Sequence, residues 1–282
     1  MRANKLVVFL GAAKSRIAAD AIISKGRITT DRGQVVLLGE RLPQDEQLFL
    51  DGAPLARKNK DSSHSYLAFH KPPGYLTSWS QEHGRPCLHD ALKLSRQGPP
   101  NIPHLMHCGR LDYASEGLLL LTSDGNWSQM VCHPSHGALK RYFVGASRSG
   151  AETSQIASPQ QVSELLKRGV TLKRDLGSRE STFNERPARA IAARVLSLSE
   201  VAMRTTQKNA CPRTVYFDIA IKEGRKRVVR RMMKALGWDV TRLLRMGVGK
   251  VELAGLNAGE WRHLTTLEIN SFLEIGRTGH EE

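Results

Sequence analysis

The sequence is poor in cysteine and in long apolar runs, and each scarcity excludes a class of protein. Its four cysteines show no C-x-x-C pair and no spacing typical of a disulfide framework, so reduced and mostly structural thiols are expected. The longest apolar stretch, LVVFLGAA at residues 6–13, is far shorter than the roughly 18 residues that span a bilayer. We therefore predict a cytoplasmic protein with no membrane anchor and no secretory signal.

Metal-ligating residues are equally sparse. Cys132, His133 and His136 lie close together in CHPSH, but no second pair of ligands accompanies them. The chain also has no glycine-rich loop of the kind that holds a methyl donor or a nucleotide cofactor. The sequence therefore predicts neither a metal nor a cofactor.

Acidic residues are outnumbered throughout the chain. Lys and Arg total 42 against 27 Asp and Glu, which leaves a net charge of +15. A polyanionic partner is the simplest reason for such an excess. The 282 residues, 40% of them hydrophobic, suit about two globular domains.

A polar segment at residues 52–65 is typical of a linker and divides the chain in two. Before it, two helical patterns precede three short strand patterns, RITT, QVVLLG and QLFLDG. Ser15 and Gly26 are suited to begin and end the second helix, whose predicted buried face consists of Ile17, Ala18, Ile22 and Ile23.

The second part, residues 66–282, is expected to be a mixed, mainly antiparallel α+β domain. Strand patterns alternate irregularly with helices there. The predicted strands are HLMHCGRL, GLLLLT, KRYFVGAS, ARAIAARVLSLSE, TVYFDIAIK and TRLLRMGVGKVEL.

Residues 222–237, KEGRKRVVRRMMKALG, predict an amphipathic helix. Its apolar arc is expected to pack inward and its cations to face outward. Such crowding of positive charge is either a solvated face or a site compensated by phosphates or a buried carboxylate. The arc comprises Val228, Val229, Met232, Met233 and Leu236, and the cations are Arg227, Arg230, Arg231 and Lys234.

Asp112 lies in GRLDYASEGLLLLTSDG, just before an apolar run that predicts a buried strand. Taken alone, an aspartate beside glycine is most simply a turn or capping residue. Tyr142, in KRYFV, taken alone is most simply a core aromatic on a strand.

Four stretches taken together change this interpretation. KPPGYL, GRLDYASEGLLLLTSDG, HPSHGALKRYFV and the block from EGRKRVVRRMMKALG to GEWRHLT resemble, in this order, the signature stretches of bacterial-type ribosomal RNA pseudouridine synthases of the RsuA/RluB branch. Residues 1–51 resemble the αL RNA-binding module that this branch carries ahead of its catalytic domain. The resemblance implies conversion of uridine to pseudouridine, without cofactor or metal, in ribosomal RNA or a ribosomal subunit assembly intermediate, and we expect a monomer.

The resemblance also implies roles for single residues. Asp112 corresponds to the catalytic carboxylate, which either attacks the anomeric carbon or takes the ribose 2′ proton. Arg230 is its cationic partner, and Tyr142 lies against the flipped uracil. Lys71 and Arg110 hold either phosphates or the Asp112 loop. The predicted RNA-binding residues are Arg16, Lys71, Arg110, Lys140, Arg141, Arg227 and Arg231.

Two departures from the family pattern lie in the first 51 residues. Ile17 follows Arg16 where a second arginine is usual, and ITTDRGQVV lacks the usual Asn-Gly turn, so RNA affinity or target is expected to differ. Residues 171–189 fit a charged loop without an assigned role. The competing hypothesis is a non-catalytic RNA-binding or ribosome-assembly protein, against which the combination of Asp112, Tyr142 and Arg230 argues, since backbone binding needs no carboxylate.

Overall fold

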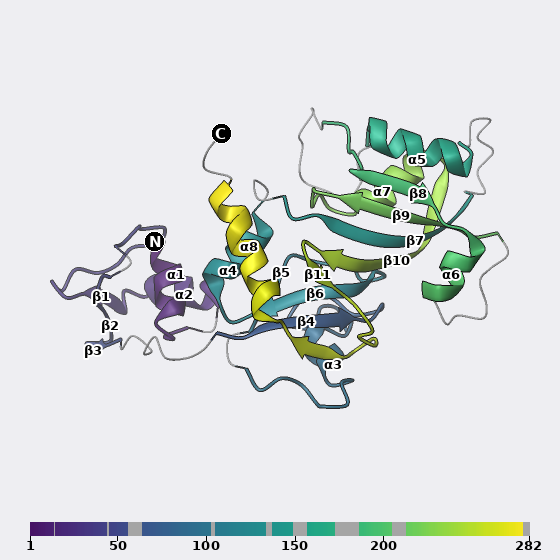
Figure 1. Cartoon of the computed structure of the whole chain (residues 1–282). Helices are drawn as coiled ribbons and strands as arrows, with labels where there is room; N and C mark the ends of the chain where they lie inside the picture. Colours follow the sequence, from purple (N-terminus) through teal and green to yellow (C-terminus); the bar gives the residue numbers. More distant parts are fainter. Residues whose placement is uncertain are drawn as a thin grey trace. The chain divides into compact units, whose positions relative to one another are not determined.

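The computed structural model describes residues 1–13, 15–43, 45–55, 64–102, 105–133, 137–148, 157–172, 186–204 and 213–278, with side chains to residue 274 (Figure 1). His136, Cys211, most of the predicted linker and residues 173–185 of the predicted loop lie outside this part of the chain. Two compact units are present, Met1–His64 and Ser65–Glu282, and each is described by itself.

The first unit pairs two helices with a small sheet around its own core. Its elements are α1 (Ala3–Phe9), α2 (Arg16–Ile23), β1 (Ile28–Thr30), β2 (Leu48–Leu50) and β3 (Ala53–Pro54). The strands are antiparallel in the order β1-β2-β3. The Ser15 hydroxyl accepts a hydrogen bond from the Ala18 N–H at 3.1 Å, which confirms the predicted cap of α2.

Two predictions for this unit are wrong. Residues 34–39, QVVLLG, form only an isolated bridge of Val35 to Thr29 and no strand, and the turn that follows takes the Leu37 N–H to the Glu40 carboxylate at 2.7 Å. Ile17 is 83% exposed, whereas Ala19 and Ile23 are buried. At about 100° per residue, Ile17 lies on the opposite side of α2 from Ala19, so it does not share the buried face.

The second unit contains a nine-stranded sheet in its described part, with the order β12-β4-β6-β10-β7-β9-β8 and with β5 on β6 and β11 on β10. Every pairing is antiparallel except that of β6 with β10. The predicted mixed, mainly antiparallel α+β fold is therefore confirmed. The strands are β4 (Tyr66–Lys71), β5 (Met106–Cys108), β6 (Glu116–Thr122), β7 (Lys140–Arg148), β8 (Ala192–Val195), β9 (Val215–Ile221), β10 (Trp238–Val248), β11 (Val251–Glu252) and β12 (Trp261–His263).

Helices cover both faces of this sheet (Figure 1). They are α3 (Leu88–Leu92), α4 (Gly125–Cys132), α5 (Pro159–Arg168), α6 (Leu198–Arg204), α7 (Val228–Ala235) and α8 (Thr266–Thr278). Side chains alternate along β7, so Tyr142 and Val144 join the core under α5 and α7, whereas Phe143 packs in the core of Trp127 and Phe272 from α4 and α8. Tyr142 and the inner face of α7 thus share one core.

Two predicted boundaries shift. The strand predicted for residues 188–200 ends at Val195, and α6 follows, because Ser197 and Glu200 form a reciprocal capping pair: Ser197 N–H donates to the Glu200 carboxylate at 2.9 Å. Helix α7 is shorter than the predicted 222–237, since Arg227 adopts a left-handed backbone with φ of 52°. The predicted apolar arc at Val228, Val229, Met232 and Met233 is buried.

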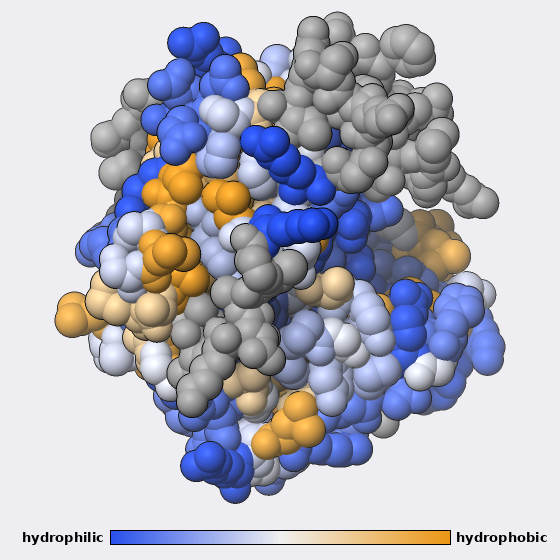
Figure 2. Space-filling view, turned by 90° about the vertical axis from the view of Figure 1, so that its right-hand side faces the viewer, coloured by the Kyte–Doolittle hydropathy of each residue, from blue (hydrophilic) through white to orange (hydrophobic). Residues whose placement is uncertain are grey.

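The face of the protein drawn in Figure 2 is mostly polar. Figure 2 shows hydrophilic residues over most of the face that it presents, with hydrophobic residues in separate groups. None of the described helices is long and apolar enough to cross a membrane.

Candidate active site

Asp112 sits in the loop between β5 and β6, and hydrogen bonds fix the backbone on both sides of it. The Thr77 hydroxyl donates to the Leu111 carbonyl at 2.7 Å and accepts from the Leu111 N–H at 3.2 Å. On the other side, the Gly74 N–H donates to the Tyr113 carbonyl at 2.8 Å. The loop that follows β4 therefore holds the Asp112 backbone, while the Asp112 side chain remains 27% exposed.

Arg230 of α7 faces this carboxylate, with its Nε 3.9 Å from Asp112 Oδ2. Its guanidinium also donates to the carbonyls of Val240 at 2.9 Å and Ala114 at 3.1 Å, so it is tied to β10 and to the Asp112 loop. The side chain is only 11% exposed, and the prediction that all the cations of this helix face outward is wrong for Arg230. Burial lowers the pKa of Arg230, the nearby charge of Arg227 lowers it further, and the charge of Asp112 raises it. An arginine nevertheless stays charged at neutral pH.

Arg227 supplies a second cation, with Nη1 4.0 Å from Asp112 Oδ2. Both distances exceed hydrogen-bond length, so the attraction is Coulombic. In the described part of the chain no hydrogen bond to the Asp112 carboxylate forms. Its oxygens thus remain available to a substrate, with two guanidinium groups about 4 Å away.

Lys71 at the end of β4 is fully buried, at 0% exposure. Its Nζ donates to the carbonyls of Pro72 at 2.8 Å and Ser115 at 2.9 Å. Burial lowers the pKa of Lys71 to about 8, against the attraction of Asp112 and Glu116. Of the two roles predicted for Lys71, the structure favours holding the Asp112 loop, because a buried ammonium cannot reach a phosphate at the surface.

Tyr142 is 7% exposed and lies on β7 opposite Arg245 of β10. Arg245 in turn lies opposite Gly117 of β6, so one strand separates Tyr142 from the strand that follows Asp112. Among the described contacts, none joins Tyr142 to Asp112. Tyr142 and Val229 belong to the same core, and α7 therefore brings Arg230 to the face of the sheet that Tyr142 occupies.

The remaining predicted cations differ in how accessible they are. Arg110 is exposed within the Asp112 loop, and Arg231 and Lys140 are half-buried. Lys140 donates to the Ala138 carbonyl at 3.2 Å, and burial lowers its pKa. Arg16 is exposed at the start of α2, in the first unit.

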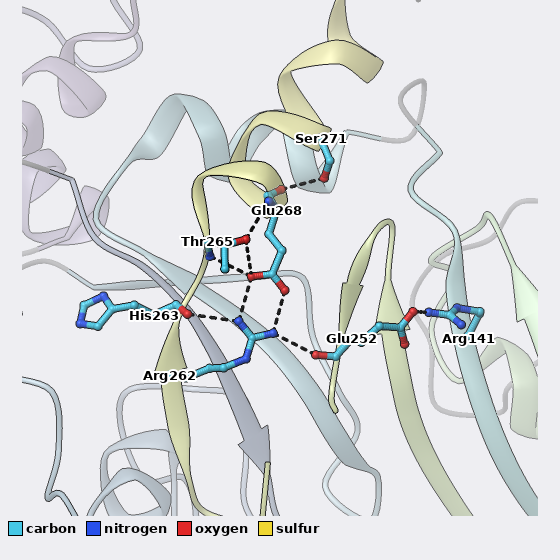
Figure 3. A network of polar contacts seen from close by, with 7 residues as sticks. All are labelled: Arg141, Glu252, Arg262, His263, Thr265, Glu268 and Ser271. Atoms are coloured by element: carbon cyan, nitrogen blue, oxygen red, sulfur yellow. Dashed lines mark hydrogen bonds and ion pairs between the residues drawn. The ribbon is translucent and has the colours of Figure 1, made fainter. Parts of the chain in front are cut away.

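Arg141 is held in a network rather than presented to solvent alone (Figure 3). It forms an ion pair with Glu252 of β11, and a Cβ at Gly247 would lie 2.7 Å from its Nη2, so the guanidinium crosses closely over this glycine. The Glu252 carbonyl accepts from Arg262 at 3.2 Å, and Arg262 is paired with Glu268 of α8. Arg141 therefore connects β7 to β11, β12 and α8 and would have to leave Glu252 to bind a phosphate.

Sequence reasoning missed three residues that support the site: Thr77, Arg242 and Arg245. Arg245 is 3% exposed, and its Nε donates to the Leu118 carbonyl at 2.7 Å. Arg242 Nε pairs with Glu116 at 2.5 Å, directly after the Asp112 loop. The irregular alternation of TRLLRMGV was a signal that these arginines do not share one exposed face, but their partners on β6 are remote in sequence.

The described residues contain no group of three His, Cys, Asp or Glu side chains that could hold a metal ion. Cys132 and His133 of CHPSH are both exposed.

Comparisons with known proteins show which family the chain resembles in sequence and fold. Residues 65–235 match the family described as RNA pseudouridylate synthase. A Mycobacterium leprae protein named as an uncharacterised RNA pseudouridine synthase is 32% identical over 278 residues, which cover 98% of this chain and 94% of that protein. Ribosomal large subunit pseudouridine synthase B of Bacillus subtilis (strain 168) is 29% identical over 279 residues, covering 99% of this chain and 98% of that one. The crystal structure of a pseudouridylate synthase, 24% identical, shares the fold with a TM-score of 0.56 over 96% of this chain and 99% of that chain.

Proposed function

The chain belongs to the RNA pseudouridylate synthase family, and from this premise we propose that it converts uridine to pseudouridine in ribosomal RNA with Asp112 as the catalytic carboxylate. The observation that carries this proposal is the backbone-anchored Asp112, whose carboxylate faces Arg230 at 3.9 Å and Arg227 at 4.0 Å. Ribosomal RNA is proposed because relatives from Bacillus subtilis and Yersinia pestis are named ribosomal large subunit pseudouridine synthase B.

The chemistry requires an ionised carboxylate next to a ribose. The bond from the anomeric carbon to uracil N1 breaks, the base turns, and a new bond forms to carbon 5, which loses its proton while N1 gains one. Asp112 either attacks the anomeric carbon or takes the 2′ proton. In both routes Arg227 and Arg230 offset the desolvation of the carboxylate that a bound nucleotide would cause.

Tyr142 is proposed to lie against the uracil after the nucleotide leaves its stack. Support comes from the core that Tyr142 shares with α7, the helix that carries Arg230. An aromatic face recovers part of the unstacking cost, of order 1 to 3 kcal/mol per base.

The remaining assignments concern the whole chain. Residues 1–51 are proposed to be an αL RNA-binding module, residues 52–65 a linker and residues 66–282 the catalytic domain. The partner is proposed to be ribosomal RNA or a ribosomal subunit assembly intermediate, in the cytoplasm, and the protein a monomer. The exposed Arg16 at the start of α2 supports RNA binding by the first unit.

The test is release of tritium from ribosomal RNA labelled at uracil carbon 5. Wild type is expected to release tritium and Asp112→Asn to release none while still binding RNA, because the amide neither attacks nor accepts a proton. Asp239→Asn is a matched control, since Asp239 also faces a cation, Lys234 at 2.8 Å, and is 48% exposed. Equal release by wild type and Asp112→Asn would show that Asp112 is not the catalytic carboxylate, and no release by wild type would support the competing non-catalytic RNA-binding or ribosome-assembly role.

A further inference from the structure

Asp112 lies in the loop between β5 and β6, and the loop that follows β4 packs against it. Main-chain hydrogen bonds close the base of the loop that follows β4. Residues 76 and 86 are joined by the Leu76 N–H, which donates to the Pro86 carbonyl at 2.8 Å, and the Leu88 N–H donates to the Ser78 carbonyl at 2.9 Å. The tip of this loop is a tight turn, with His83 at a positive φ of 52° and a bridge between Glu82 and Arg85. The chain thus holds the residues of the tip in a defined place.

Tyr113, the residue after Asp112, presents its ring to solvent beside this turn. The ring side chain is 39% exposed even though the Tyr113 carbonyl is fixed by Gly74 at 2.8 Å. The Arg85 guanidinium lies over the ring, with Cζ 5.7 Å from the ring centroid, and Arg85 is exposed. Tyr113 and Asp112 are adjacent residues of one loop, with Cα atoms about 3.8 Å apart.

We propose that Tyr113 and Arg85 form a stacking site for an RNA base that neighbours the target uridine. The inference rests on the proposed function and assigns to this side of the site a ligand class, an unstacked nucleobase. Removing a uridine from its stack leaves the adjacent bases without a neighbour, and an aromatic ring accepts any base because every base has a π face. Arg85 covers part of the ring, adds cation–π attraction and keeps N–H groups for the RNA backbone.

The arrangement of charge around Asp112 agrees with this assignment. Arg227 and Arg230 approach the carboxylate from α7, whereas Tyr113 and Arg85 belong to the two loops that fix its backbone. RNA would then meet two cations from α7 and, from the loops, an aromatic ring with a cation, which is the combination that single-stranded nucleic acid prefers.

A purely structural role for the Tyr113–Arg85 pair is the simpler alternative. Main-chain bonds at Leu76 and Leu88, together with the Thr77–Leu111 pair, already close and fasten the loops. The pair is therefore not needed to close them, and exposed cation–π pairs contribute little to stability. A stacking role predicts a change in substrate affinity, whereas a structural role predicts a change in stability or in kcat.

The experiment measures tritium release from ribosomal RNA transcripts labelled at uracil carbon 5. Tyr113→Ala is expected to raise KM by about 5- to 140-fold, the factor that corresponds to loss of one base stack, with kcat within about threefold of wild type. Tyr113→Phe keeps the ring and should match wild type, and Arg85→Gln should raise KM by about 2- to 5-fold. Arg148→Gln is the matched control, because Arg148 lies over another ring, that of Trp238, at 6.0 Å.

Binding gives a second measurement that does not depend on turnover. In an Asp112→Asn background, adding Tyr113→Ala should weaken binding of the same RNA by a similar factor, with an unchanged thermal midpoint. An active wild type with an unchanged KM in Tyr113→Ala would overturn the stacking site, as would a loss confined to kcat, which would make Tyr113 a positioning residue. An inactive wild type would instead remove the proposed function, and the inference with it.

Discussion

The Lys71 ammonium is a buried charge between β4 and the Asp112 loop, and its two carbonyl partners carry no full charge. Pro72 and Ser115 accept from Nζ at 2.8 and 2.9 Å. Desolvation outweighs the attraction of Asp112 and Glu116, so the pKa of Lys71 falls from an ordinary value of 10.5 to about 8. The folded state therefore binds this proton more weakly than the unfolded chain does.

The shifted pKa of Lys71 predicts how stability depends on pH. Below about pH 8 Lys71 is protonated in both the folded and the unfolded state, and the cost of burying its charge is present in full. Between pH 8 and 10.5 Lys71 keeps its proton only in the unfolded chain, so the free energy of unfolding rises with pH. The gain is of order 3 kcal/mol, at about 1.4 kcal/mol per pH unit. Lys71→Met should remove this rise, measured by urea unfolding from pH 7 to 10.5.

The comparison must be made between variants, because Tyr66, Lys140, Cys108 and Cys132 also have shifted pKa values. Lys234→Met serves as the control, since Lys234 is 63% exposed and pairs with Asp239. If Lys71→Met and wild type showed parallel pH profiles, the burial of a charged Lys71 would be refuted.

At the scale of single residues, sequence patterns located Asp112 and Arg230 but not the environment of either. Their pairing across 3.9 Å depends on how α7 packs on the sheet, which the resemblance implied and no local pattern contains. The burial of Lys71 was equally hidden, because a lysine before two prolines is typical of a surface turn. The pairing of Arg141 depends on Glu252, more than a hundred residues away along the chain.

At the scale of helices and strands, the pairing of β6 with β10 depends on one glycine. Gly117 has φ of +108°, and a Cβ there would lie 2.4 Å from the Arg245 carbonyl oxygen. This is where the only parallel pair of the described sheet begins, with Glu116 and Gly117 opposite Leu244 and Arg245. The strand that follows the Asp112 loop can start at this place only if the residue lacks a side chain.

Gly117→Ala is therefore expected to destabilise the protein by about 2 to 4 kcal/mol, from backbone strain and from displacement of β10. Chemical denaturation measures the loss. Gly224→Ala is the matched control, because a Cβ at Gly224 meets nothing within 4 Å and its φ is not left-handed, so a change within about 0.5 kcal/mol is expected. A similar small change for Gly117→Ala would show that β6 and β10 separate without cost.

Elements with a local signal were predictable, and those decided by competing contacts were not. The apolar arc of α7 followed from its spacing, whereas its start depends on the left-handed Arg227. The capping pair of Ser197 and Glu200 is readable in SLSE and would have placed α6 correctly. QVVLLG has the composition of a strand, but its second half forms a turn in which the Leu37 N–H donates to the Glu40 carboxylate.

At the scale of the whole molecule, both units carry exposed cations, whereas the candidate active site lies in the second unit alone. The first unit has its own core, with Leu6, Ile28 and Leu48 fully buried, and it presents Arg16 at the surface. The second unit contains Asp112 and its two cations. A net charge of +15 in a protein of this family is explained by attraction to RNA phosphates, and our proposal that residues 1–51 bind RNA gives part of that attraction to the first unit.

That division predicts a measurable salt dependence for the full chain. Each neutralised phosphate lowers the slope of log affinity against log salt by about 0.7 on single strands and about 0.9 on duplexes, so five contacts would give a slope of about −3.5 to −4.5. Arg16→Gln should make the slope shallower by about 0.7 to 0.9 in RNA binding measured from 50 to 300 mM salt. Arg27→Gln is the matched control in the same unit, because Asp51 already neutralises Arg27 through a bidentate pair. Identical slopes for wild type and Arg16→Gln would mean that Arg16 contacts no phosphate, and the first unit would then have to bind RNA through other cations or not at all.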